Sequence, residues 1–142
     1  MKKSSAAKID RTTPDREEMI ERVTALVPSL AQRAEQVEKN RTIHPDTVQE
    51  FWDTQLWSIM KPRRYGGLEL DYAMLVDVPD YVARGCASTS WIYANLVIHD
   101  WMLAMWPPEA QDGYGKITPA PSWRRLLYPM PAALRLLLAV TG

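Results

Sequence analysis

One apolar segment of the chain carries the side chains that are best placed for chemistry. Its polar and aromatic residues recur at spacings of three and four, which puts them on one face of a helix: Ser88, Trp91, Asn95 and His99, with Met102 one turn further on. An imidazole exchanges protons near neutral pH. His99 is therefore a candidate acid–base or hydrogen-bonding residue that faces a pocket, and Ser88, Trp91 and Asn95 are candidate residues of the same ligand-lined pocket.

The same pattern has a second interpretation. A histidine within so apolar a helix is commonly a core residue whose ring is satisfied by a neighbour or a backbone carbonyl. Both interpretations require partners for the polar groups, because a buried polar group without a hydrogen bond is costly. The residues alone do not decide between a core histidine and a ligand-facing one.

Other residues offer weaker candidates. His44 directly precedes Pro45 at a helix entry, which favours an exposed position near a cap. Cys86 is the only cysteine, which excludes an intramolecular disulfide framework, and a buried structural thiol is favoured over a nucleophile. Gly66-Gly67 lacks the other residues of a nucleotide-binding fingerprint and predicts a turn. No motif predicts a metal site, and no residue is assigned to a cofactor.

The apolar periodicity predicts an all-α body of four to five helices. The first is expected from Thr13-Pro14, with Thr13 as its cap, to about Lys39-Asn40, and Pro28 is expected to kink or break it. Later helices are expected after His44-Pro45-Asp46, from Asp71 to Arg84, from about Trp91 to Met105, and from Glu109. Between them, Trp57–Met60 is expected as a short strand or turn, and residues 61–67 as a loop. The helix after Trp91 is apolar on nearly every side, which predicts a central, covered position.

The charge is distributed unevenly along the 142 residues. Residues 1–112 hold thirteen basic and seventeen acidic residues, a net charge of −4, whereas residues 113–142 hold four basic residues and no acidic one. An acidic body argues against nucleic acid as a partner. The absence of a long apolar run argues against a membrane span, so a cytoplasmic protein is expected.

Several motifs then occur in a recognisable order. In chain order they are Arg41-Thr42-Ile43-His44-Pro45-Asp46-Thr47, Leu56-Trp57, Pro62-x-x-Tyr65-Gly66-Gly67-x-Glu69, Ala83-Arg84-x-Cys86-Ala87-Ser88-x-Ser90-Trp91 and His99-Asp100-Trp101. Together they resemble the N-terminal helical domain of the acyl-CoA dehydrogenase superfamily. The last two motifs are most similar to its flavin-dependent monooxygenase branch, the oxygenase components of two-component aromatic hydroxylases of the p-hydroxyphenylacetate and secosteroid-phenol type.

The resemblance implies a function for the helix face. In this branch the histidine of the His-x-Trp motif, here His99, lines an aromatic substrate pocket, orients a phenol and helps to remove its proton. Trp91 and Asn95 would line the same cavity. The resemblance also implies reduced flavin, FMN or FAD, as cofactor, a separate flavin reductase as partner, and a homotetramer. An acyl-CoA dehydrogenase fragment and a non-enzymatic helical interaction module are the alternatives.

The resemblance covers residues 13–112 and stops where the acidic residues stop. Residues 1–12 are expected to be a disordered lead-in. When residues 113–126 are translated back to codons and read in a shifted frame, the permitted residues include Val-Trp-Lys-Asp-Asn-Pro-Gly-Thr-Leu-Val-Ala-Ser-Ser, which fits the family's continuation into a β-domain. Residues 113–142 are therefore interpreted as an out-of-frame, irregular and poorly packed tail, with a genuine basic tail as the alternative. A fragment of this kind is expected to be inactive alone and not to retain flavin.

Overall fold

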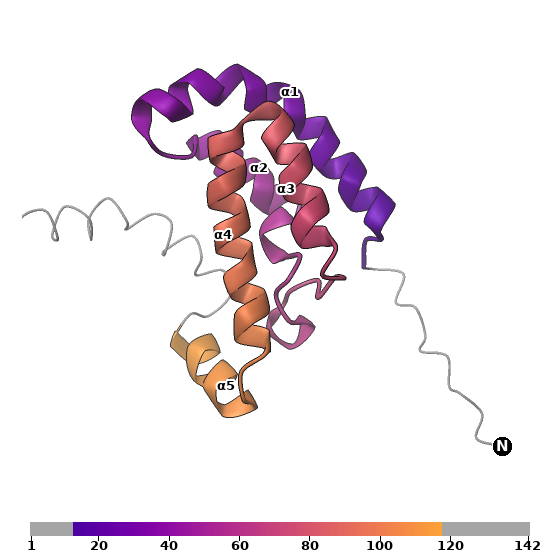
Figure 1. The fold of residues 1–142 in the computed structure, drawn as a ribbon. Coiled ribbons are helices and arrows are strands. Elements are labelled where there is room, and N and C mark those ends of the chain that lie inside the picture. The colour runs from indigo at the N-terminus through magenta and orange to yellow at the C-terminus, as the bar shows by residue number, and fades with distance from the viewer. Residues whose placement is uncertain (1–12, 118–142) are drawn as a thin grey trace, which may run out of the picture. The chain divides into compact units, whose positions relative to one another are not determined.

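The structure is a computed structural model that describes residues 13–117, and these form an all-α fold (Figure 1). The described part contains five α-helices and two short 3-10 helices and no strand: α1 Arg16–Asn40, α2 Pro45–Asp53, η1 Leu56–Ser58, η2 Arg63–Tyr65, α3 Met74–Gly85, α4 Ala87–Ala104 and α5 Pro108–Ile117. The all-α prediction is confirmed. The described residues fall into two compact units, which divide between Trp101 and Met102. The expected lead-in, residues 1–12, and residues 118–142 of the expected tail lie outside the described residues.

The first helix begins slightly later than its sequence signals suggest. Asp15, not Thr13, is the N-cap, and its carboxylate accepts a hydrogen bond from the backbone N–H of Glu18 at 2.9 Å. Pro28 lies inside α1 but does not divide it, so the predicted break into two helices is wrong. Figure 1 shows a single helix that bends along its length. The helix ends at Arg41, whose left-handed backbone (φ 51°) turns the chain toward α2.

Close packing between α1 and α3 depends on a glycine. The two helices make the most extensive contact between elements in the described part of the chain. At Gly85 a Cβ atom would lie 2.6 Å from the Cβ of Leu30 and 2.8 Å from the carbonyl oxygen of Val27. The absence of a side chain at Gly85 therefore sets how closely the end of α3 approaches α1.

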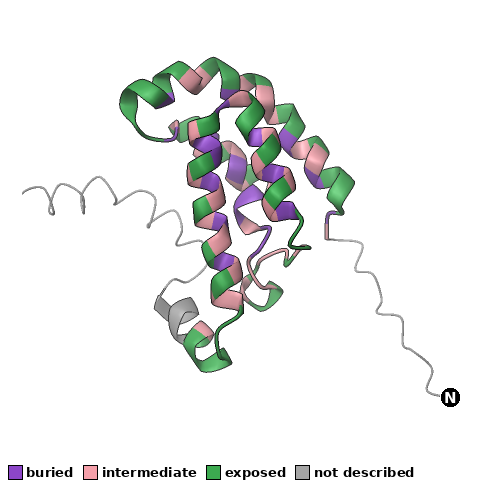
Figure 2. Cartoon of the chain, viewed as in Figure 1, coloured by how far each residue is buried: buried purple, intermediate pink, exposed green. Residues whose placement is uncertain are grey.

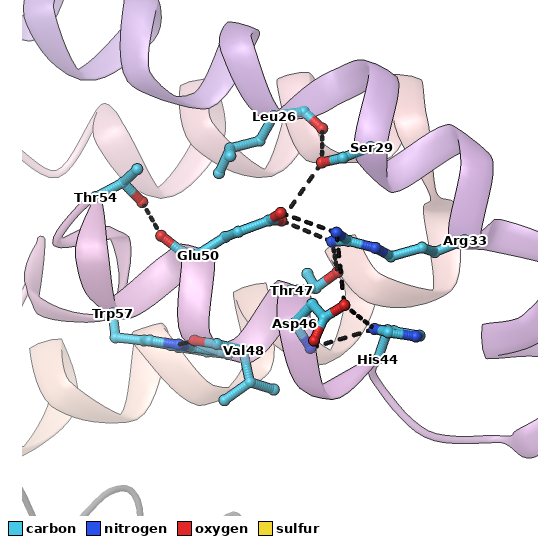
Figure 3. Close-up of polar contacts among 10 residues, drawn as sticks. All are labelled: Leu26, Ser29, Arg33, His44, Asp46, Thr47, Val48, Glu50, Thr54 and Trp57. Atoms are coloured by element: carbon cyan, nitrogen blue, oxygen red, sulfur yellow. Dashed lines mark hydrogen bonds and ion pairs between the residues drawn. The ribbon is translucent and has the colours of Figure 1, made fainter.

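A polar cluster joins α1 to α2 (Figure 3). Arg33 binds Glu50 at two points, Nη1 to Oε2 at 2.8 Å and Nη2 to Oε1 at 2.9 Å, and Nη1 also donates to the hydroxyl of Thr47. The hydrogen bond to Glu50 is the main cause of the raised pKa of Arg33, so the guanidinium is held in its charged form. At the start of α2 the Nδ1 atom of His44 accepts the backbone N–H of Asp46, which makes His44 the N-cap.

Aromatic rings from three elements form the centre of the core. Phe51 packs edge-on against Trp57 and Tyr93, with ring centroids 5.3 Å apart in each pair. The hydroxyl of Tyr93 is fully buried and donates to the carbonyl of Leu56 at 2.8 Å. Leu56 and Trp57 belong to the 3-10 helix η1, so the expectation of a strand or turn at Trp57–Met60 is replaced by a 3-10 turn.

The segment between η1 and α3 folds back on itself. The backbone N–H groups of Leu68 and Leu70 donate to Ser58 and Ile59, and the N–H of Glu69 donates to Lys61. A Cβ atom at Gly67 would lie 2.0 Å from the carbonyl oxygen of Lys61, so only glycine fits there. Residues 61–67 are a loop that contains η2, as the sequence predicts, and they return the chain to the start of α3.

The fourth helix is longer and less covered than the sequence predicts. It begins at Ala87, four residues before the predicted start, so Ser88, Thr89 and Ser90 lie in its first turn and do not cap it. Its inner face buries residues of the core: Thr89, Ser90, Tyr93, Val97 and Asp100. Its other face is exposed, with Trp91 at 73% of its full accessible surface (Figure 2). The predicted central, fully covered position is therefore wrong for the residues described.

The second unit contains a short helix of its own. The side-chain amide of Gln111 in α5 donates to the carbonyls of Ala104 and Trp106, at 3.0 and 2.7 Å. These bonds satisfy backbone acceptors at the end of α4, which would otherwise lack partners. The start of α5 at Pro108 agrees with the helix expected near Glu109, and α5 continues to Ile117, five residues beyond the predicted limit of the helical domain.

Candidate active site

Three of the four predicted site residues lie together on the exposed face of α4. Trp91, Asn95 and His99 are each exposed and occupy successive turns of the helix. Ser88 lies one turn earlier and is half-buried, and its hydroxyl donates to the carboxylate of Glu38 near the end of α1. That bond ties the first turn of α4 to α1, so the Ser88 hydroxyl proton is engaged in a contact between helices.

The side chains of Asn95 and His99 both bond to backbone carbonyls one turn back. The amide nitrogen of Asn95 donates to the carbonyl oxygen of Trp91 at 2.8 Å. The Nδ1 atom of His99 makes a short hydrogen bond to the carbonyl oxygen of Asn95. A carbonyl oxygen only accepts, so Nδ1 carries a hydrogen, and in the uncharged form of the ring the lone pair is on Nε2.

The surroundings of His99 combine features of both interpretations. The ring is satisfied at Nδ1 by a backbone carbonyl, as a core histidine would be, but the residue is exposed and not part of the core. In its uncharged form the ring has an acceptor at the remaining nitrogen, Nε2. An exposed imidazole whose Nδ1 hydrogen is bonded to a carbonyl can then accept a hydrogen bond or a proton from a ligand hydroxyl.

A buried carboxyl group lies on the opposite face of the same helix. Asp100 is only 6% exposed and follows His99 directly in the chain. Burial raises its pKa to about 7 and is the main cause of the shift. The positive charges of Lys61 and His99 have the opposite effect and lower the pKa. Asp100 in turn contributes to the raised pKa of Tyr93, whose main cause is burial. The sequence prediction of the site does not include Asp100, although a charged residue within so apolar a helix is the signal that could have found it.

The described residues do not gather into a group of metal ligands, and the turn at Gly66 and Gly67 has its backbone donors engaged. Between residues 13 and 117 no three His, Cys, Asp or Glu side chains gather as metal ligands. The backbone N–H groups of Gly66 and Gly67 donate to Arg63 and Pro62, so they are not free to bind a phosphate group. None of the helices in this part of the chain is long and apolar enough to cross a membrane.

Comparison with known proteins identifies the family. The family model of the acyl-CoA dehydrogenase N-terminal domain matches residues 13–113. The chain belongs to this family. The resemblance drawn from the motifs is therefore confirmed, and the match includes α1 to α4 and the candidate site on α4.

Relatives with curated names belong to the monooxygenase branch. The oxygenase subunit HsaA of a flavin-dependent monooxygenase from Rhodococcus jostii is 29% identical over 93 residues, which cover 66% of this chain and 24% of the relative. The oxygenase component of p-hydroxyphenylacetate 3-hydroxylase from Acinetobacter baumannii is 28% identical over 94 residues, 66% of this chain and 22% of the relative. The crystal structure of the HsaA monooxygenase from M. tuberculosis superposes with a TM-score of 0.65 at 27% identity, covering 70% of this chain and 27% of that one. This chain thus spans about a quarter of the length of these relatives.

Proposed function

We propose that the chain is the N-terminal helical part of a flavin-dependent monooxygenase that hydroxylates an aromatic, phenolic substrate. The names of its relatives support the reaction class. The observation that carries the assignment of the site is the bond between His99 Nδ1 and the Asn95 carbonyl, because it leaves Nε2 as an acceptor for the phenol hydroxyl. Trp91 offers an exposed ring face one turn beyond Asn95, against which an aromatic substrate would pack.

The chemistry of the chain's own residues is proton transfer and orientation. A phenol that donates to Nε2 of His99 is fixed in direction, and partial removal of its proton increases electron density at the ring carbons beside the oxygen. Reduced flavin, when bound by the whole protein, supplies together with O₂ the oxygen atom that is transferred. An acyl thioester has a carbonyl acceptor in place of the hydroxyl donor, so this face suits it less than a phenol.

We further propose that the 142-residue chain alone neither holds flavin tightly nor turns over substrate. The loop that contains Gly66 and Gly67 uses its backbone donors internally, and the chain spans a quarter of its relatives. Gel filtration of the purified chain with FMN or FAD tests this proposal. Flavin absorbance that comigrates with the protein, or a hydroxylated product, would contradict it.

The reading-frame interpretation of residues 113–142 is a proposal of its own. The match to the family model ends at residue 113, which supports it. Sequencing the coding DNA decides between an out-of-frame tail and a genuine basic tail. A continuation without β-domain sequence of this family in the shifted frame would overturn the proposal.

For the whole protein we propose a flavin reductase partner, a homotetramer and a cytoplasmic location, with no role for nucleic acid or a membrane. The relative's name, oxygenase subunit, supports a second component that delivers reduced flavin. Stopped-flow measurement of reduced-flavin oxidation, with and without a reductase from a relative, tests the partner. It shows whether reduced flavin reaches the oxygenase by diffusion or needs the reductase.

The test of the function uses the protein with its reading frame restored. Phenols are expected to perturb the flavin spectrum and to gain one oxygen atom in the presence of reduced flavin, whereas acyl-CoA thioesters are expected to do neither. His99→Leu is expected to lower the hydroxylation rate by about 10²-fold or more, the range of general acid–base catalysis. Reduction of the flavin by a thioester would instead indicate an acyl-CoA dehydrogenase, and partner binding without any flavin effect would indicate an interaction module.

A further inference from the structure

The helices α3 and α4 form an antiparallel pair that only Cys86 separates in the chain (Figure 1). Near this junction the hydroxyl of Ser90 in α4 donates to the carbonyl of Pro79 in α3 at 2.7 Å. At the far end the ring of Trp101 in α4 packs edge-on against Tyr72, in the turn before α3, with ring centroids 5.0 Å apart. The outer sides of the two helices therefore form one continuous surface.

A stripe of apolar residues runs along each helix on this surface. The residues of each stripe recur at alternating spacings of four and three, which is typical of helices that pack against other helices. On the α3 side they are Tyr72, Val76, Pro79 and Ala83, and on the α4 side they are Ala87, Trp91, Ala94, Ile98 and Trp101. None of the nine is buried, and Trp91, Val76 and Tyr72 are 73%, 66% and 50% exposed. Together these nine residues form the α3–α4 seam.

No Asp, Glu, Lys or Arg belongs to the α3–α4 seam. The charged residues of α3 are paired elsewhere within the chain, Asp80 with Arg84 at 2.6 Å and Asp77 with Arg16 of α1 at 2.7 Å. In α4 the one residue of these four types, Asp100, lies on the inner face. A second copy of the same surface therefore brings no like charges together and leaves no charge buried without a partner. In its charge the seam is complementary to itself.

The shape of the seam also suits a second copy. On α4 the small residues Ala87 and Ala94 alternate with the large residues Trp91 and Ile98, and a small residue leaves space for a large side chain of a facing helix. Two antiparallel helix pairs that meet at such surfaces form a four-helix bundle, with their axes inclined by about 20°. A two-fold axis gives both copies the same contacts, so the arrangement closes as a dimer.

The exposed area of the seam predicts how tightly two copies would bind. Burial of its aromatic and aliphatic side chains would remove on the order of 500 Å² of surface per copy from water. Stable interfaces bury about 800 Å² per partner, and weak, reversible ones bury less than about 600 Å². An association through this seam is therefore expected to be reversible, with a dissociation constant in the micromolar range.

We propose that the α3–α4 seam is an interface between two copies of this chain, whose α3 and α4 helices associate into a four-helix bundle. The interface lies beside the candidate active site. Ala94 and Ile98 belong to the seam, Asn95 and His99 lie on the next side of α4, and Trp91 lies between the two groups. The proposal therefore holds whether or not His99 takes part in catalysis.

The test makes one substitution at two positions of the 142-residue chain. Ala83 and Ala25 are both exposed on helices, but Ala83 belongs to the seam and Ala25 lies on α1 outside it. Sedimentation equilibrium measures the dissociation constant of the dimer. Ala83→Glu is expected to weaken the dimer by about 10²-fold or more, because it places two like charges within the interface. Ala25→Glu adds the same charge and is expected to change the constant by less than about twofold.

Val76→Glu, at a second exposed position of the seam, is expected to give the same result as Ala83→Glu. The amide spectrum of each ¹⁵N-labelled variant shows whether its fold is unchanged. In the unmodified chain, the amide signals of Val76 and Ala94 are expected to shift as the concentration rises, whereas the signal of Ala25 is expected to stay in place.

Salt distinguishes the seam from an association of oppositely charged parts of the chain. The dissociation constant is expected not to rise between about 0.05 and about 0.5 M NaCl, because no charge pair forms across the seam. A chain that is monomeric at every concentration would overturn the proposal. So would a dimer that salt dissociates, or one that persists in Ala83→Glu and Val76→Glu, since either result would place the contact on another surface.

Discussion

Arg33 and Glu50 form a two-point ion pair that joins α1 to α2, with nitrogen–oxygen distances of 2.8 and 2.9 Å (Figure 3). Their side chains are only 22% and 29% exposed, so water screens the pair less than it would on the open surface. Hydroxyl groups of Ser29 and Thr47 bond to the same two side chains. The pair therefore lies within a satisfied network, which stabilises the angle between the two helices.

Removal of one member of this pair is expected to destabilise the domain. Glu50→Ala leaves the Arg33 guanidinium half-buried without its main partner, and a hydrogen bond to a charged group contributes about 1.5–3 kcal/mol. Urea unfolding measures the change. The matched control is Asp80→Ala, which breaks the exposed pair of Asp80 with Arg84 and is expected to destabilise the domain much less, because water screens an exposed pair. Equal losses in the two variants would contradict the assignment.

Gly85 provides a steric test of the contact between α1 and α3. Gly85→Ala places a methyl group 2.6 Å from Leu30 Cβ and 2.8 Å from the Val27 carbonyl, so the helices must move apart. Overpacking of this kind costs about 1–3 kcal/mol in unfolding free energy. Gly66→Asn is the comparison, because Gly66 has a positive φ of 80° that asparagine tolerates, and a Cβ atom there would meet no other atom within 4 Å. A Gly85→Ala protein as stable as Gly66→Asn would show that the helices are not held at this spacing.

The helices of this fold could be predicted from the sequence because their signals are local. Apolar spacing locates α1 to α4, and Pro45 marks the first residue of α2. The exact caps could not be predicted in the same way, since Thr13 and Asp15 are both good capping residues two positions apart. Long-range pairs such as Ser88 with Glu38, separated by 50 positions, leave no trace in local sequence.

The sequence predicts which residues share one face of α4, but it does not predict the hydrogen bonds that their side chains make. Spacing alone placed Trp91, Asn95 and His99 on one side of α4, and the structure keeps them together. Whether this face of α4 is buried or exposed depends on which other segments pack against it. The local sequence of the helix does not encode those contacts. The position of Asp100 on the inner face follows from its place in the helical repeat, but its raised pKa depends on how deeply the surrounding segments bury it.

His44 is expected to contribute to stability through its role at the start of α2. Its Nδ1 accepts the Asp46 N–H at 3.2 Å, so His44→Ala leaves that donor without its side-chain partner. Loss of an N-cap costs about 0.5–2 kcal/mol, measurable by urea unfolding near neutral pH. His44→Asn restores a capping acceptor and is expected to recover most of the loss. If alanine and asparagine at this position give the same stability, the capping bond contributes nothing measurable.

Asp100 is expected to make the stability of the domain depend on pH. Burial raises its pKa from 3.8 to about 7, so the folded state binds a proton more tightly than the unfolded state does. The stabilisation from that proton is complete below the unfolded pKa and is lost as the pH rises through the folded one. Between about pH 5 and about pH 8.5 the predicted loss is about 2–3 kcal/mol, since one pKa unit corresponds to about 1.4 kcal/mol.

Asp100→Asn removes the titrating group and keeps its size. The variant is expected to gain stability relative to the unmodified chain as the pH rises, by about 2–3 kcal/mol between about pH 5 and about pH 8.5, because an amide carries no charge that burial can penalise. Lys61 and His99, whose positive charges favour ionised Asp100, and Tyr93 beside it are unchanged in this variant. Glu35→Gln, at an exposed carboxylate, is the control and is expected to leave the pH dependence as it was. If the free energy of unfolding depends on pH in the same way for Asp100→Asn and the unmodified chain, the prediction is wrong. Asp100 would then be ionised in the folded state, with the positive charges of Lys61 and His99 offsetting the cost of its burial.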